Sequence, residues 1–89
     1  AFRYTFTKPL KFGDKGGDVT ALQHALRLDG EFPVDQPLTI NFGPITKKAV
    51  IDFQEKYASE ILIPIGLIHG TGFVGARTLQ KLNQLYAGQ

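Results

Sequence analysis

The sequence predicts an all-α fold: a compact three-helix bundle with irregular loops and an extended N-terminal arm. Two observations predict this class. Apolar residues recur at three- and four-residue spacing in three separate segments, which is typical of amphipathic helices. The segments also share a weak internal repeat, and a single unit of that size cannot bury its own apolar face. The 89 residues, 43% of them hydrophobic, suffice for one domain and are too few for two.

The predicted domain covers residues 10–86, between an N-terminal arm or linker (residues 1–9) and a frayed tail (residues 87–89). Aromatic residues in the arm alternate with polar ones, and this period of two indicates an extended segment or a short strand. The alternating aromatic residues are Phe2, Tyr4 and Phe6. No signal peptide is visible at the start, so we expect either a mature terminus or a cut from a longer chain.

The first helix is expected to begin near Asp18, whose carboxylate can cap it by accepting from free backbone N–H groups. Gly30 is expected to end it. The expected buried face contains Val19, Leu22, Ala25 and Leu26.

Two further helices are expected to open with a glycine. Gly43 precedes Pro44, whose missing N–H does no harm at the first helical position, and Gly75 opens the third helix similarly. The apolar face of the second helix is predicted to contain Ile45, Ala49, Val50, Phe53 and Tyr57. That of the third is predicted to contain Leu79, Leu82 and Leu85, with Tyr86 beside them. Between these helices, residues 58–72 form a long loop whose apolar side chains are expected to fold back onto the core.

The internal repeat consists of short motifs that recur at offsets of 31 and 32 residues. The motif V-x-x-L-Q-x-x-L, which starts at Val19, corresponds to V-x-x-F-Q-x-x-Y at Val50. The motif F-G-x-x-T at Phe42 corresponds to V-G-x-x-T at Val74. In each unit a glycine permits a tight turn, and a threonine three residues later can bond local backbone.

These motifs together resemble the peptidoglycan-binding domain family, which occurs as modules on cell-wall hydrolases. The resemblance runs from Leu10 to about Leu85, in three blocks. The matching residues are Leu10, Gly13, Gly16, Val19, Leu22, Gln23 and Leu26; then Phe42, Gly43, Thr46, Ala49, Val50, Phe53 and Gln54; then Val74, Gly75, Thr78 and Leu82. It implies a non-catalytic module that binds peptidoglycan and tethers an attached enzyme or surface protein to the wall, in a secreted or cell-envelope location. It also implies a fused or associated cell-wall hydrolase domain as partner.

The chain departs from the family pattern where Asp-Gly usually precedes the second and third blocks. Thr39-Ile40 and Thr71-Gly72 stand there instead. Threonine can bond nearby backbone as aspartate does, but it carries no charge. The amides of Gln23 and Gln54 are expected to bond the backbone of a neighbouring loop and hold the repeats together, in preference to contacting ligand.

The expected ligand-binding residues lie at the loops that open the second and third helices. They are Asn41, Phe42, Gly43, Thr46, Tyr57, Phe73, Gly75 and Arg77. Free N–H groups at a helix start can take an anion such as a stem-peptide carboxylate, although simple capping is the alternative. Aromatic rings can stack on sugar or peptide, and most of them are expected in the core. Arg77 is the preferred side chain, because a cation in a first helical turn opposes the helix dipole.

Other classes of function have less support. The chain lacks cysteine, and two isolated histidines are not a zinc site, so we expect no metal and no cofactor. Asp52 and Glu55 fit a solvated face better than a glycosidase pair. The net charge of +2 is scattered, which argues against a nucleic acid partner. The longest apolar stretch, 61–68, is too short for a membrane span.

Three alternatives remain beside peptidoglycan binding. A protein-interaction or pro-domain-like module of the same fold would pack against its own enzyme through the apolar run 61–65. A DNA-binding helix-turn-helix would need several base- or phosphate-reaching side chains, of which the third helix offers few. An enzyme ranks last, because no acid, base, nucleophile or metal constellation is present.

Overall fold

The computed structural model describes residues 2–88; Ala1 of the predicted arm and Gln89 of the predicted tail lie outside the described residues. Three long helices form the fold: α1 (Gly17–Asp29), α2 (Pro44–Lys56) and α4 (Ala76–Tyr86). A one-turn helix, α3 (Ala58–Ile61), and a 3₁₀ turn, η1 (Ile63–Ile65), lie within the long loop after α2. The all-α prediction is confirmed. Residues 2–88 contain two isolated β-bridges and no strand.

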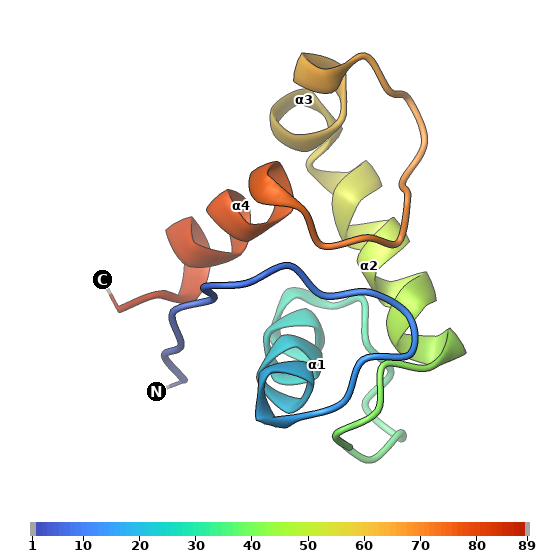
Figure 1. Cartoon of the computed structure of the whole chain (residues 1–89), viewed down its shortest axis with the longest axis vertical. Helices are drawn as coiled ribbons and strands as arrows, with labels where there is room; N and C mark the ends of the chain where they lie inside the picture. The colour runs from blue at the N-terminus through green and yellow to red at the C-terminus, as the bar shows by residue number, and fades with distance from the viewer. Residues whose placement is uncertain (1, 89) are drawn as a thin grey trace.

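The three long helices enclose one core, and α3 lies at one end of the molecule, away from α1 (Figure 1). The largest fully buried side chains come from all three long helices and from the segments between them: Leu22, Leu26, Phe42, Phe53, Ile61, Leu62 and Leu82. No helix within residues 2–88 has the length and apolar character needed to cross a membrane.

The N-terminal arm is extended and packs along α4, as the alternation of its residues predicts. The Tyr4 N–H donates to the Tyr86 carbonyl at 3.0 Å, and Asn83 bonds both backbone groups of Phe6, which is 4% exposed. The arm therefore closes the core on the side where it lies against the C-terminal end of α4 (Figure 1).

Asp18 does not cap α1, so that prediction is wrong. The helix begins at Gly17 with no side-chain cap. The Asp18 carboxylate instead accepts from the Tyr4 hydroxyl and pairs with Lys8 Nζ at 3.1 Å. Tyr4 and Lys8 of the arm bond the Asp18 carboxylate, so this carboxylate does not accept from the free N–H groups of α1. Gly30 ends the helix as predicted, at φ 104°, a conformation that favours glycine.

Two residues that the helical periodicity placed in the core are exposed. Ile45 is 44% exposed because it lies in the first turn of α2, where it borders an open pocket with Pro33 and Pro44. Leu85 is 39% exposed, because the buried stripe of α4 passes through Leu82 and Leu85 lies to one side of it.

The long loop after α2 folds back onto the core only in part. Ile61 and Leu62 are each 1% exposed, but Ile63, Ile65 and Ile68 are 57%, 55% and 73% exposed. The single turn of α3 points two consecutive side chains inward, and the chain then continues along the outside. The expectation that the apolar side chains of this loop fold back onto the core is therefore correct for Ile61 and Leu62 and wrong for Ile63, Ile65 and Ile68.

Gln23 is 1% exposed and links α1 to the loop before α2. Its Nε2 donates to the Asn41 carbonyl at 3.1 Å and to the Thr46 hydroxyl at 2.9 Å, and its Oε1 accepts from the Thr39 N–H at 2.7 Å. The predicted structural role of Gln23 is confirmed. The hydroxyl of Thr46 was expected to bond local backbone, but it accepts the hydrogen bond from Gln23 Nε2 instead.

Gln54 repeats this arrangement one unit later, between α2 and the loop before α4. Its Nε2 donates to the Phe73 carbonyl at 2.7 Å and to the Thr78 hydroxyl at 3.1 Å. Its Oε1 accepts from the N–H groups of Thr71 and Gly72 at 2.8 and 3.1 Å. The sequence repeat is therefore also a repeat of hydrogen bonds, in which one amide fixes the start of the next helix.

Thr39 and Thr71, which stand where the resembled family usually has Asp, both make the expected local bond. The Asn41 N–H donates to the Thr39 hydroxyl at 3.1 Å, and the Phe73 N–H donates to the Thr71 hydroxyl at 3.0 Å. The substitution thus preserves the turn and removes only the charge.

We expect Gln54→Ala to destabilise the protein by about 3 kcal/mol, because it removes a hydrogen-bond partner from four buried or partly buried backbone and hydroxyl groups. Urea unfolding monitored by circular dichroism measures the change. Gln80→Ala, at an exposed site on α4, is the control and is expected to stay within about 0.5 kcal/mol of the parent chain. Equal effects of the two variants would contradict the role given to Gln54.

Candidate functional site

A groove lies between the α3–η1 segment and the N-terminal half of α4. It consists of two pockets that share Arg77. The polar pocket, about 350 Å³, is lined by Ser59, Glu60, Pro64, Arg77, Gln80, Lys81 and Gln84. The apolar pocket, about 240 Å³, has walls that include Ile61, Leu62, Ile65, Phe73, Gly75 and Arg77. The groove therefore combines an apolar half with a half rich in hydrogen-bonding groups.

The polar half contains two cations in different electrostatic states. Lys81 Nζ pairs with Glu60 at 3.0 Å, also donates to Gln84 Oε1 at 3.0 Å, and lies 4.6 Å from the centre of the Tyr57 ring. Arg77, one turn earlier on α4, is exposed and has no ion-pair partner among residues 2–88. The uncompensated guanidinium can bind a carboxylate through two parallel hydrogen bonds.

The apolar half presents the ring of Phe73, which is 46% exposed. A Cβ at Gly75 would lie 3.0 Å from this ring, so the absence of a side chain at Gly75 lets Phe73 lie close to the backbone. Ile65, 55% exposed, lines the same pocket. An exposed ring beside an aliphatic side chain is a surface on which the apolar face of a sugar or a methyl group can pack.

The structure divides the predicted ligand-binding residues between two places. Phe73, Gly75 and Arg77 come together in the groove. Asn41, Gly43 and Thr46 line a separate pocket of about 210 Å³ at the start of α2.

The two remaining candidates lie outside both places. Phe42 is 2% exposed and belongs to the core. Tyr57 is half-buried, and its hydroxyl donates to Asp29. Contact of the eight candidate residues with ligand stays a prediction.

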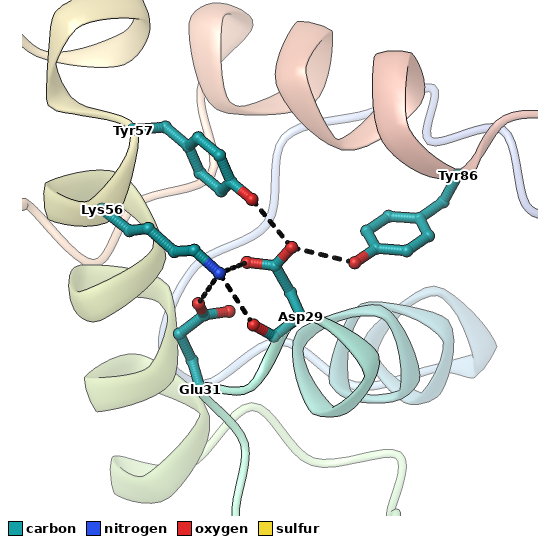
Figure 2. Close-up of polar contacts among 5 residues, drawn as sticks. All are labelled: Asp29, Glu31, Lys56, Tyr57 and Tyr86. Atoms are coloured by element: carbon teal, nitrogen blue, oxygen red, sulfur yellow. Dashed lines mark hydrogen bonds and ion pairs between the residues drawn. The ribbon is translucent and has the colours of Figure 1, made fainter.

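A second cluster of polar groups, which the sequence did not indicate, joins the C-terminal ends of the three long helices (Figure 2). Asp29 Oδ1 accepts from the hydroxyls of Tyr57 and Tyr86 at 2.9 and 3.0 Å. Lys56 Nζ lies 3.1 Å from Asp29 Oδ2 and 3.6 Å from Glu31 Oε2. The side chains of Asp29 and Glu31 are only 8% and 7% exposed.

Burial and mutual contact shift the titration of this cluster. Burial, the hydrogen bond to Asp29 and the charge of Asp29 raise the pKa of Glu31 to about 8. Burial alone would raise the pKa of Asp29, but hydrogen bonds from Glu31, Lys56, Tyr57 and Tyr86 hold it below its usual value. Burial, followed by the bond to Asp29, raises the pKa of both tyrosines.

Within residues 2–88, no three His, Cys, Asp or Glu side chains come together in a way that could hold a metal ion.

Comparison with known proteins relates the chain to one family and to solved domains. Residues 15–59 match the family described as "Putative peptidoglycan binding domain". The solved SleB N-terminal domain is 29% identical, with a TM-score of 0.71 over 92% of this chain and 97% of that one. A Burkholderia AP3 phage endolysin is 28% identical, with a TM-score of 0.67 over 92% of this chain and 27% of the endolysin. No curated protein sequence matches the chain.

We expect Asp29→Ala to destabilise the protein by about 2 kcal/mol at pH 7, because it removes the acceptor of two tyrosine hydroxyls and of Lys56. Asp52→Ala is the matched control, since Asp52 forms an exposed pair with Lys48; it should cost about 0.5 kcal/mol or less. Thermal or urea unfolding measures both. A cost for Asp29→Ala no larger than that of the control would show that the cluster does not hold the helix ends.

Proposed function

Because the chain belongs to the peptidoglycan-binding domain family, we propose that it binds peptidoglycan in the groove between the α3–η1 segment and α4. The observation that carries the proposal is the pairing of an uncompensated cation, Arg77, with an exposed ring, Phe73, on the two sides of Gly75. Peptidoglycan offers carboxylates on its peptides and apolar faces on its sugars. The groove offers a partner for each of these groups.

The remaining polar side chains of the groove suit the amide and hydroxyl groups of such a ligand. Gln80, Gln84 and Ser59 line the polar pocket and can donate and accept hydrogen bonds. The groove is small, so binding by one domain is expected to be of modest affinity. The repeating wall lattice would raise the effective affinity of a protein that carries the domain next to another wall-binding module.

We further propose that the domain acts as a non-catalytic tether in the cell envelope or in a secreted protein. The endolysin comparison supports this role, because the matched region is 27% of that longer chain. A catalytic partner domain would then remain near its polymer while this domain holds the wall.

A second candidate function is packing against an attached or associated enzyme. The observation that favours it is the exposure of Ile63 and Ile68, which are 57% and 73% exposed and lie outside the linings of both groove pockets. Exposed aliphatic side chains on adjacent turns of one loop are typical of a contact surface.

The first test is co-sedimentation with purified insoluble peptidoglycan, with cellulose and duplex DNA as control polymers. Pelleting is expected with peptidoglycan alone and at physiological salt. We expect Arg77→Ala to weaken binding about tenfold, the effect of losing one charge-assisted contact worth about 1.4 kcal/mol. Lys48→Ala, which removes an exposed cation of α2, should leave binding unchanged. A folded parent chain that does not pellet would overturn the proposal.

The double variant Ile63→Ser/Ile68→Ser separates the two candidate functions. If the groove is the binding site, the variant should pellet with peptidoglycan as well as the parent chain does, because neither side chain lines the groove. A large loss of pelleting, with an unchanged unfolding midpoint, would move the binding surface to the exposed loop.

A further inference from the structure

The buried cluster at the helix ends contains more negative than positive groups. Asp29 and Glu31 are both carboxyl side chains more than nine-tenths buried, and among residues 2–88 Lys56 is the one cation that pairs with them. With both carboxyls ionised, the three side chains would carry a net charge of −1 in a place with little water. With one proton added, their net charge is zero. Burial of an uncompensated charge is costly, so the neutral arrangement is favoured.

The hydrogen bonds identify the carboxyl that keeps the proton. Both oxygens of Asp29 have donors: the two tyrosine hydroxyls at Oδ1 and Lys56 at Oδ2. Glu31 Oε1 is buried and has no hydrogen-bond partner. An ionised Glu31 would leave this buried oxygen without a protein hydrogen-bond donor. A protonated Glu31 becomes a donor, and the acceptor next to it is the Asp29 carboxylate, which contacts the same Lys56 Nζ.

We propose that Asp29 and Glu31 share one proton, and that the protonated pair is a pH-sensitive latch that holds the C-terminal ends of α1, α2 and α4 together. The charged and titratable groups that face the pair are Lys56 from α2, Tyr57 from the junction of α2 and α3, and Tyr86 from α4. Lys81 of α4 faces the outer side, with Nζ 4.6 Å from the centre of the Tyr57 ring.

The latch is connected to the groove through Tyr57. This residue bonds Asp29 and also immediately precedes α3, whose Glu60 pairs with Lys81 in the polar pocket. Loss of the shared proton would leave two adjacent buried negative charges, and their repulsion would displace Asp29 from its bond to Tyr57 and so loosen the α3 wall. This consequence rests on the proposed peptidoglycan binding, whereas the latch itself does not.

The direction of the pH effect follows from linkage. The pKa of Glu31 is about 8 in the folded protein, against an ordinary value of 4.5. Between these values the folded chain keeps a proton that the unfolded chain has released, so this group's contribution to stability falls as pH rises from 4.5 to 8. Asp29 acts in the opposite sense, because its pKa is lowered and its contribution is lost in acid.

The decisive variant is Glu31→Gln, whose neutral amide can still donate to Asp29. Urea unfolding between pH 6 and 9 should show the folding equilibrium constant of the parent chain falling roughly 10- to 100-fold, and that of Glu31→Gln changing far less. Asp52→Asn, which neutralises an exposed carboxylate, should follow the parent chain. A pH slope in Glu31→Gln equal to that of the parent would overturn the latch.

A direct titration keeps the test decisive even if the variant folds poorly. The side-chain carboxyl carbon of Glu31 in the parent chain, followed by NMR, should titrate well above the ordinary glutamate value of 4.5, and a midpoint near 4.5 would refute the shared proton. Pelleting with peptidoglycan at pH 6 and 9 tests the link to the groove: the parent should bind more weakly at pH 9 and Glu31→Gln equally at both. Equal binding of the parent at both pH values would refute that link. Absence of pelleting at both would refute the proposed function and leave the latch to be judged by the titration.

Discussion

The fold depends on one interaction that occurs twice: a buried glutamine amide that fixes the loop leading into the next helix. Gln23 and Gln54 each satisfy a backbone N–H, a backbone carbonyl and a threonine hydroxyl that the core would otherwise leave unpaired. A short irregular loop cannot satisfy these groups internally, and unpaired buried polar groups are costly. The two amides therefore determine where α2 and α4 start. The positions of the side chains in the first turns of these helices follow from those starts.

The groove exists because the two repeats differ in what surrounds this shared arrangement. The start of α2 faces a loop of prolines and polar residues, which leaves a shallow pocket beside Ile45. The start of α4 faces the α3–η1 segment, whose buried Ile61 and Leu62 anchor a wall opposite Phe73 and Arg77. Ile45 in the first repeat corresponds to Arg77 in the second. The cation is therefore found in the repeat whose helix start faces the α3–η1 segment.

The opposite ends of the helices pose a separate electrostatic problem. Asp29 lies in the last turn of α1, where the helix dipole disfavours a carboxylate. Lys56 and the two tyrosine hydroxyls offset this cost by donating to the Asp29 carboxylate. These bonds connect the ends of α2 and α4 to the end of α1 (Figure 2). None of these residues is among the motif positions on which the family resemblance rests, and they give this chain a titratable cluster outside the groove.

The sequence by itself determined the helix class, the glycine boundaries at Gly30, Gly43 and Gly75, and the structural role of the two glutamines. These follow from local periodicity and from motifs whose partners recur at a fixed offset, so they need no knowledge of distant contacts. Only the tertiary structure decided that Asp18 serves the N-terminal arm, that Ile45 and Leu85 are exposed, and that Asp29, Glu31, Lys56, Tyr57 and Tyr86 meet. Each of these depends on which segment covers a given side chain, and such long-range coverage leaves no periodic signal in the sequence. The same reason explains why Arg77 could be chosen from its place in a helix turn, while its groove became visible only once α3 was in place.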